Sequence, residues 1–536
     1  MTENQPLRPR FDLIEEAWIP CETLGGAPIE LGIRDVLRRA HELAAVNDES
    51  PLVTAVLHRL LLAIVDQAFL PKNREEWLAI WSAKELPMGP IDAYLARWKD
   101  RFDLFDADRP FMQVARLEET LLKDKGKPAE RTSMWRMVIE TSNCGGHIHV
   151  FEREPEAATL APARAARALL AFMAFTNGGR IQNEAESWKG GNLRPGAVAL
   201  VRGGSLRETL VLNTCAKSAR NAEDIPPWQR ERPIARLVRS PAGAIDALMW
   251  PSRRVALFPV VDGDAVSVRE VLTAAGERMD ADVADPQMAY FERNPKNPPM
   301  ALRFDPDRSV WRDAAALFDR ATGVGAFRRP HAVDQLHGLL VDRVLSRNVK
   351  WAVDLLGMST DKAVIRLTRA ERLPLSPGLL LDAERIDTLK SALVLAEAVG
   401  QGLNQKVLFV LCERALAPAE REAHKDDIQK LKDALAVMPS FWSALGKEFE
   451  RWLVGLADAE DCDAALADWK VLLRRTTRAS FDHACRRLGT EARSLQAIAQ
   501  AENTLRKMLA EHLPVLSPAP SPGDVALTTS AEGVAS

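Results

Sequence analysis

The clearest helical pattern in the first half of the chain begins at Ser50-Pro51. Serine is a preferred N-cap and proline is favoured at the first helical position, so this dipeptide predicts a helix start. The apolar positions that follow recur at steps of three and four residues, which is the period of one helical face. They are Val53, Val56, Leu57, Leu60, Leu61 and Ile64.

Strand patterns frame the beginning of the chain. The segment from Phe11 to Pro20, FDLIEEAWIP, mixes apolar and acidic residues and ends on a proline, which predicts a first strand. Gly25-Gly26 predicts the turn after it, and residues 28–31 predict a returning strand. We expect residues 32–45 to be helical and residues 255–261 to form a further strand.

The pattern changes after Pro377, where prolines and glycines become rare. Four long helices are predicted, over residues 383–415, 426–457, 460–487 and 490–512. The apolar positions of the last helix recur at helical spacing: Leu495, Ile498, Leu505, Met508 and Leu509. Short connections between long amphipathic helices predict an antiparallel bundle.

These patterns predict an α+β protein of two domains. A large mixed α/β N-terminal domain covers residues 1–377, and a C-terminal four-helix bundle covers residues 378–513. Residues 514–536 are rich in Pro, Ser, Ala and Thr, which is typical of a disordered tail.

Glycine pairs are concentrated in residues 143–204. Pro162 predicts the start of a helix there, and Asn177-Gly178-Gly179 predicts its end. Paired glycines let another molecule approach bare backbone amides, and the neighbouring cations indicate an anionic ligand. Those cations are Arg180, Lys189, Arg194 and Arg202. The alternative is a set of ordinary tight turns.

Composition narrows the class of protein. The chain has 536 residues, of which 47% are hydrophobic and 27% charged, as in a globular protein of several domains. Its net charge of −3 excludes a simple polycation, but nucleic-acid binding requires only local positive charge. The six cysteines form no C-x-x-C pair, so we predict no structural zinc. The N-terminus lacks an apolar signal core and the apolar runs are short, so we expect a cytoplasmic protein with no membrane partner.

Motifs of catalysis are missing from the sequence. It contains no phosphate-binding G-x-x-x-x-G-K-[ST], no G-x-G-x-x-G and no G-x-S-x-G. His147 and His149 would share one face of a strand, with Cys144 nearby, but such a pair is common by chance. We therefore predict no catalytic residue, no cofactor and no metal. An enzyme of unknown class that uses the glycine-rich loops and these histidines is the alternative. A helical scaffold with no nucleic-acid role is a third interpretation.

Three basic, loop-rich segments indicate nucleic-acid binding. They cover residues 174–207, 217–254 and 343–372. Lysine and arginine on loops neutralise phosphates without sequence-specific geometry. For any one segment, a solvated surface is the simpler interpretation.

Several strings, in this order, resemble the CasA family, the large subunit of the type I-E CRISPR Cascade surveillance complex. The resemblance covers about residues 11–513. Its carriers are FDLIEEAWIP, the segment 102–113 that ends in RPFMQ, Ser142-Asn143 followed by Phe151, ALLAFMAFTNGGR at 168–180, MWPSRRVAL at 249–257 and the C-terminal helices.

The resemblance implies a subunit at one end of a guide-RNA complex, in contact with the other Cascade subunits. Such a subunit recognises a protospacer-adjacent motif in target double-stranded DNA, mainly from the minor groove. It promotes strand opening and R-loop formation in antiviral defence. It also docks the helicase-nuclease effector and is not itself an enzyme.

The resemblance also implies which residues bind nucleic acid. The loop that contacts the 5′ end of the CRISPR guide RNA corresponds to residues 143–153, with Asn143 at its start and Phe151, Glu152 and Arg153 at its tip. An aromatic residue there would stack on a base, which is worth roughly 1–3 kcal/mol. The family's glycine loop corresponds to Asn177, Gly178 and Gly179, followed by Arg180.

At two further family elements, the wedge and the minor-groove lysine, this sequence departs from the family pattern. The strand-separating wedge corresponds to Asp361, Lys362 and Ala363, where Lys362 replaces the family's glutamine. A lysine wedge would interact more with phosphates and be more sensitive to salt. The family's minor-groove lysine has no clear match in this sequence, and Arg278 is the candidate for its role. The cysteine cluster of some relatives is missing, which again predicts no metal.

Overall fold

The structure is a computed structural model. It describes residues 9–69, 71, 73–126, 128–141, 159–181, 183–184, 186–194, 196–214, 221–280, 285–291, 299–306, 308–319, 327–361, 364–416 and 425–514. The chain divides into two compact units, Met1–Ile386 and Asp387–Ser536. The two units meet between Ile386 and Asp387. The predicted boundary between residues 377 and 378 lies earlier, inside α11 (Pro377–Leu381).

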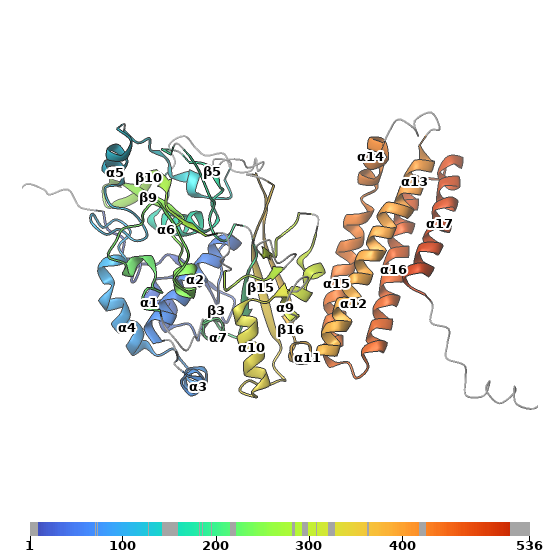
Figure 1. Cartoon of the computed structure of the whole chain (residues 1–536), viewed down its shortest axis with the longest axis horizontal. Coiled ribbons are helices and arrows are strands. Elements are labelled where there is room, and N and C mark those ends of the chain that lie inside the picture. The colour runs from blue at the N-terminus through green and yellow to red at the C-terminus, as the bar shows by residue number, and fades with distance from the viewer. Residues whose placement is uncertain are drawn as a thin grey trace, which may run out of the picture. The chain divides into compact units, whose positions relative to one another are not determined.

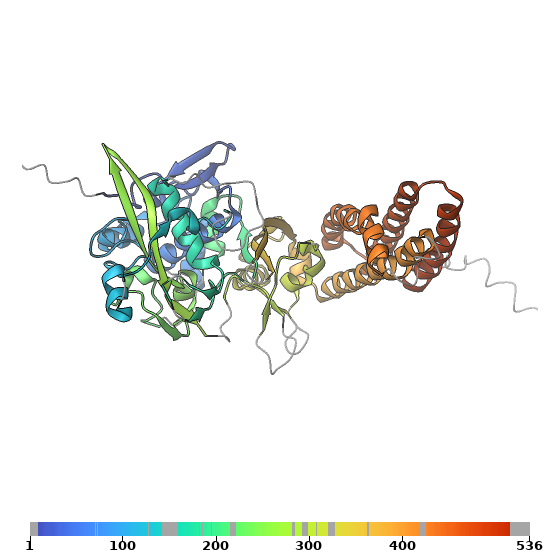
Figure 2. The same ribbon diagram turned by 90° about the horizontal axis from the view of Figure 1, so that it is seen from above.

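The first unit mixes helices with several small sheets (Figures 1 and 2). The described strands pair in the orders β2-β1-β3, β4-β10-β9, β11-β8, β13-β12-β14, β16-β15-β7 and β5-β6. The strands are β1 (Ile19–Thr23), β2 (Pro28–Leu31), β3 (Leu43–Val46), β4 (Thr132–Ser133), β5 (Gly179–Arg180), β6 (Ser187–Trp188), β7 (Val198–Arg202), β8 (Leu237–Arg239), β9 (Arg253–Asp262), β10 (Ala265–Ala275), β11 (Glu277–Met279), β12 (Tyr290–Phe291), β13 (Met300–Ala301), β14 (Phe327–Arg328), β15 (Trp351–Asp361) and β16 (Val364–Leu375).

The first unit also contains many helices. The α-helices are α1 (Ile33–Arg38), α2 (Pro51–Phe69), α3 (Arg74–Ser82), α4 (Met88–Arg97), α5 (Leu117–Lys125), α6 (Pro162–Phe175), α7 (Leu206–Leu212), α8 (Ala244–Leu248), α9 (Ala315–Phe318), α10 (His331–Val341) and α11. Short 3-10 turns are η1 (Lys99–Arg101), η2 (Met134–Met137), η3 (Pro227–Gln229) and η4 (Val310–Asp313).

Helix α2 is the centre of the first unit. It begins at Pro51, and the Ser50 hydroxyl accepts from the backbone N–H groups of Leu52 at 3.2 Å and Val53 at 3.3 Å, as predicted for an N-cap. The helix is long and apolar enough to cross a membrane by length and composition, but 78% of that apolar window is buried inside the protein. Its packing against α4, α6, α8 and β15 therefore identifies it as a core helix.

A buried histidine on α2 makes stability depend on pH. His58 is fully enclosed, and its Nδ1 lies 2.8 Å from the carbonyl of Thr54. Burial, followed by the charge of Arg202, lowers the pKa of His58 to about 4. The unfolded chain therefore takes up a proton between about pH 6.5 and pH 4 that the folded chain does not, so stability is lost as the pH falls through this window.

We expect His58→Leu to remove this pH dependence. The parent should lose about 3 kcal/mol relative to the variant between pH 7 and pH 4, which urea unfolding at both pH values measures. Parallel losses in the two proteins would contradict the assignment, because any carboxylate contribution is common to both.

The predicted first strand is mostly a turn. Residues 11–18 lack regular pairing apart from a single bridge between Asp12 and Asp103, and β1 begins only at Ile19. The Asp12 carbonyl accepts from Glu15 and Glu16, and its carboxylate accepts from the Ile14 N–H. These local hydrogen bonds compete with a sheet ladder, which explains the difference.

The segment 32–45 is also less helical than predicted. Only Ile33–Arg38 forms α1, and β3 follows over Leu43–Val46 and pairs antiparallel with β1. The returning strand is confirmed, since β2 pairs with β1 in the register Ile19↔Leu31. The predicted strand at 255–261 lies inside β9.

Two long antiparallel ribbons extend through the first unit. The strands β9 and β10 pair from Arg253↔Ala275 to Asp262↔Ala265, and β10 contacts α6 (Figures 1 and 2). The strands β15 and β16 pair from Trp351↔Leu375 to Asp361↔Val364. This second ribbon ends at the position where the wedge residues are predicted.

The second unit is helical in its described part (Figure 1). Its helices lie close to the predicted spans. They are α12 (Ala383–Gly402), which begins in the first unit, the π-helical turn η5 (Leu403–Val407), α13 (Leu408–Ala415), α14 (Lys425–Leu435), α15 (Val437–Asp458), α16 (Cys462–Leu488) and α17 (Ala492–His512).

One predicted helix of the second unit is broken. Ala436 has a left-handed backbone with φ of 50°, and it separates α14 from α15. The Arg487 side chain on α16 donates to the carbonyls of Ala434 and Leu435 at 2.7 and 3.1 Å. These bonds satisfy carbonyls at the end of α14 that lack intrahelical partners, so the break is stabilised from a neighbouring helix.

Candidate nucleic-acid interface

Helix α6 leads into the predicted glycine loop. It begins at Pro162, as predicted, and ends at Phe175. Thr176 then has extended backbone with φ of −54° and ψ of 146°, so the glycines do not cap the helix as predicted. The glycines instead allow close contact between backbone segments.

Three glycines allow two backbone segments to cross closely. The Gly191 N–H donates to the Thr176 carbonyl at 2.8 Å. A Cβ atom on Gly191 would lie 2.1 Å from the Ala174 oxygen, and one on Gly190 would lie 2.7 Å from the Thr176 oxygen. A Cβ on Gly178 would lie 2.9 Å from the Gly190 nitrogen. Only glycine permits this approach.

Gly179 has another role. Its φ is +126°, a conformation that side-chain-bearing residues rarely adopt, and no heavy atom lies within 4 Å of a Cβ built on it. It pairs with Trp188, so β5 and β6 form a small hairpin, which we call the glycine hairpin (residues 177–190). The exposed backbone of Gly179 is therefore accessible to another molecule.

A buried arginine binds the backbone at both ends of the glycine hairpin. Arg253 is 1% exposed and donates to the carbonyls of Asn177 and Lys189, both at 2.9 Å. Arg194 donates to the side-chain oxygen of Asn177 at 2.8 Å. Both ends of the hairpin are thus tied to β9, which begins at Arg253.

The strand that contains Arg278 is linked to the glycine hairpin. The Lys189 ammonium donates to the Met279 carbonyl at 3.3 Å, which joins the glycine hairpin to β11. Arg278 is the middle residue of β11 and is exposed, as is Arg180 on β5. Among the described residues, neither Arg278 nor Arg180 has an ion pair or a hydrogen bond from its side chain.

Charged side chains of both signs lie around this hairpin. Burial, followed by the charge of Arg303, lowers the pKa of the Arg194 guanidinium, which places two cations close together. The Arg236 guanidinium lies 5.0 Å from the ring of Trp188 and pairs with Glu186 at 2.6 Å. Carboxylates compensate the charge of Arg236, so Arg180 and Arg278 are better placed to attract an anion.

Many arginines of the predicted basic segments are internal. Arg202 pairs with Asp354 at 3.3 Å, and Arg207 donates to the carbonyls of Ile80 and Trp81. Arg230 and Arg239 are engaged by buried carboxylates. The expectation that whole segments present positive charge is therefore too broad, because much of that charge holds the fold together.

Other predicted residues lie outside the described part of the chain. These are Asn143, Phe151, Glu152 and Arg153 of the guide-RNA loop, Lys362 and Ala363 of the wedge, and the pair His147 and His149. Asp361 is the last residue of β15, and its backbone pairs with Val364.

The described residues contain no group of three or more His, Cys, Asp or Glu side chains that could hold a metal. Burial raises the pKa of Cys21 to about 12 and that of Cys412 to about 11. These two thiols are therefore protonated and inert at neutral pH.

The fold and sequence match known proteins. The family model described as CRISPR-associated protein Cse1 matches residues 12–480. A curated CRISPR-associated protein CasA/Cse1 of Thermus thermophilus is 33% identical over 518 residues, which cover 94% of this chain and 98% of the relative.

Solved structures agree. A crystal structure of Thermus thermophilus CasA has a TM-score of 0.79 at 31% identity, with 94% of this chain and 100% of the other covered. A chain of a CRISPR RNA-guided surveillance complex has a TM-score of 0.72 at 21% identity, over 93% of this chain and 100% of the other, which shows a shared fold.

The class that these findings define is that of the CRISPR-associated proteins. The chain belongs to the Cse1 family, also called CasA. The resemblance noted in the sequence is confirmed.

Proposed function

We propose that this protein is the large subunit of a CRISPR RNA-guided Cascade complex and recognises a protospacer-adjacent motif in target duplex DNA. The observation that carries the proposal is the junction of the glycine hairpin with β11. The bond from Lys189 to Met279 connects the hairpin that contains Gly179 and Arg180 to the strand that contains Arg278, and these three residues are exposed.

The chemistry of this surface suits the minor groove. That groove is only about 6 Å wide, so a bare backbone such as that of Gly179 enters more easily than a side chain. Arginines favour its negative potential and the phosphates on either side. Because the minor groove presents a degenerate hydrogen-bonding pattern, we expect several motif sequences to be accepted.

Family membership supports the remaining parts of the role. The shared fold with a chain of a CRISPR RNA-guided surveillance complex supports contacts with other Cascade subunits and with guide RNA. We assign the guide's 5′ end to the loop of Asn143, Phe151, Glu152 and Arg153. Recruitment of the helicase-nuclease completes the proposed function, which is binding rather than catalysis. We also propose that helices α12 to α17 form an antiparallel four-helix bundle. The predicted tail after Pro514 lies outside the described residues.

The β15–β16 ribbon supports the proposed wedge. Its last described pair is Asp361↔Val364, so Lys362 and Ala363 connect the two strands. A residue at the end of a long paired ribbon is carried by a stiff support, and a wedge must withstand the stacking energy of the base pair that it separates.

We expect Lys362→Ala to slow strand opening roughly tenfold while initial duplex binding changes little, because a wedge acts after recognition. A fluorescent base analogue placed next to the motif would report opening. Lys350→Ala is the control, since Lys350 is an exposed cation before the other end of β15. Equal opening rates in the Lys362→Ala complex and the parent would refute the wedge assignment.

The proposed function as a whole is tested by DNA binding with and without the other subunits. Motif-bearing duplex should bind the assembled complex more tightly than duplex with a permuted motif, and the isolated chain should not make this distinction. Metal-dependent turnover by the isolated chain would instead support an enzyme.

A further inference from the structure

The strand that carries Arg278 is short, and its neighbours hold it in place. β11 has three residues and pairs in parallel with β8, in the register Glu277↔Leu237, Arg278↔Val238 and Met279↔Arg239. Side chains alternate along a strand, so Glu277 and Met279 face inward while Arg278 faces outward. Glu277 is 1% exposed. A ladder of three residues provides little rigidity by itself.

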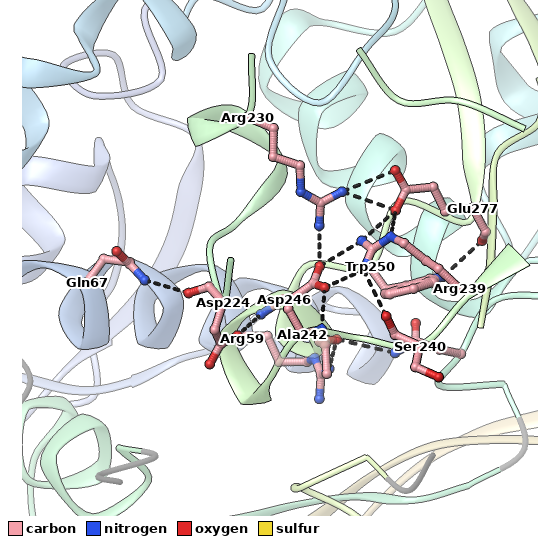
Figure 3. Close-up of polar contacts among 12 residues, drawn as sticks. Arg59, Gln67, Asp224, Arg230, Arg239, Ser240, Ala242, Asp246, Trp250 and Glu277 are labelled. Atoms are coloured by element: carbon pink, nitrogen blue, oxygen red, sulfur yellow. Dashed lines mark hydrogen bonds and ion pairs between the residues drawn. The ribbon is translucent and has the colours of Figure 1, made fainter. Parts of the chain in front are cut away.

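Figure 3 shows what lies behind the strand. The Glu277 carboxylate accepts two hydrogen bonds of 3.1 Å from Arg230 and one of 2.6 Å from Arg239. Asp246 accepts from the same two arginines, including a bond of 2.9 Å from Arg239. Two carboxylates and two guanidiniums thus form a closed, neutral group, which we call the charge network (Arg230, Arg239, Asp246 and Glu277).

The charge network is enclosed and anchored. The Glu277 and Asp246 side chains are each 1% exposed, and Arg230 is 9% exposed. The Trp250 indole donates to the Glu277 carbonyl at 2.9 Å, and the Arg239 guanidinium lies 4.1 Å from the Trp250 ring. Hydrogen bonds from arginine to carboxylate are directional, and a low local dielectric strengthens them.

The backbone of β11 is fixed on both sides of Arg278. The Glu277 N–H donates to the Pro251 carbonyl at 2.9 Å, and the Asp280 N–H donates to the Arg239 carbonyl at 3.2 Å. Lys189 of the glycine hairpin donates to the Met279 carbonyl. The backbone of β11 is therefore held in place, while the exposed Arg278 side chain can contact another molecule.

We propose that the charge network is a positioning device for motif recognition: Glu277 sets the direction of Arg278 beside the glycine hairpin. Arg230, Arg239 and Asp246 act through Glu277 and do not touch DNA. This inference rests on the proposed function, because it assigns a support to the cation of that interface. It predicts that recognition depends on buried residues with no access to the ligand.

The test is a double-mutant cycle in the assembled complex, with Glu277→Gln, Arg278→Ala and the two combined. Arg278→Ala should weaken binding of motif-bearing duplex about tenfold and reduce the salt slope by about one. Glu277→Gln keeps the shape of the side chain but removes its charge, and it should reproduce most of both effects. The double variant should be no weaker than Arg278→Ala alone.

Asp354→Asn is the matched control. Asp354 is a largely buried carboxylate that Arg202 and Arg372 share, on β15, which pairs with neither β8 nor β11. It should lower stability without changing the salt slope. If Glu277→Gln does not fold, Arg239→Lys replaces it, because lysine keeps the charge but loses the planar fork.

The outcomes separate the inference from the proposed function. If Arg278→Ala weakens binding but Glu277→Gln does not, the positioning role is wrong and the interface stands. If the binding losses of the two variants add, Glu277 acts independently of Arg278, and the inference is overturned. If Arg278→Ala binds as the parent does, Arg278 is not part of the interface and both assignments fail.

Discussion

Replacing Gly179 by aspartate is expected to eliminate motif-dependent DNA binding by the assembled complex. A side chain at this position would project from the exposed face of the glycine hairpin, where no protein atom lies within 4 Å of the added Cβ. It would enter the space that the proposed minor-groove contact needs, and its charge would repel the phosphates. We expect a loss of at least about tenfold, comparable with the 1–3 kcal/mol of one mismatched base pair.

Two further variants separate the charge of aspartate from backbone strain. Gly179→Ala imposes the same strain at φ of +126° without charge, so it should lose less affinity. Gly489→Asp places a charge and a strained backbone, at φ of +90°, at the end of α16, and it should leave DNA binding unchanged. Titration of motif-bearing and permuted duplex gives the affinities. If Gly179→Asp distinguishes motif-bearing from permuted duplex as well as the parent does, the glycine hairpin is not part of the DNA interface.

Arg59→Met is expected to destabilise the first unit by about 3–5 kcal/mol, the range for removing one partner of a buried ion pair. Arg59 is 0% exposed and forms two hydrogen bonds with Asp285, at 2.9 and 2.8 Å. It also donates to the carbonyls of Leu248 and Ala247. Methionine fills a similar volume but leaves the Asp285 charge buried without its cation.

Arg74→Met is the control for this prediction. Arg74 pairs with Asp342 at 2.5 Å, but both side chains are more than 40% exposed. Surface pairs contribute about 0–1 kcal/mol, so this variant should unfold close to the parent. Urea unfolding followed by tryptophan fluorescence compares the two. Similar losses in both variants would show that burial does not determine the importance of the Arg59 pair.

The elements that the sequence predicted well are those with one buried face. Helix α2 and the helices after Pro377 have apolar residues at helical spacing because one side packs against the core. The first predicted strand was wrong because Asp12 offers its own backbone neighbours local hydrogen bonds, and periodicity does not register these. Ala436 likewise interrupts a helical pattern through a backbone conformation that its side chain does not indicate.

The candidate site was predictable only in part. Glycine pairs are visible in a sequence, so Gly178 and Gly179 could be selected before the structure was known. The contact between Lys189 and Met279 joins segments that are remote in the chain, and no local pattern signals it. The sequence also could not distinguish Arg278, which faces outward, from Arg230 and Arg239, whose charge is compensated inside. The roles of Asn143, Phe151, Glu152, Arg153, Asp361, Lys362 and Ala363 stay predictions.

Side chains alternate along β11, so the residues that anchor the strand and the residue that can contact a ligand lie on opposite sides of it. Glu277 and Met279 face the interior, and Arg278 between them is exposed. Substitution at position 278 therefore exchanges the presented group while the support keeps its geometry. We expect variation at positions 180 and 278 to change motif preference without loss of folding. Under the proposed function, single substitutions at such outward positions would change which motif is accepted while the buried support stays the same.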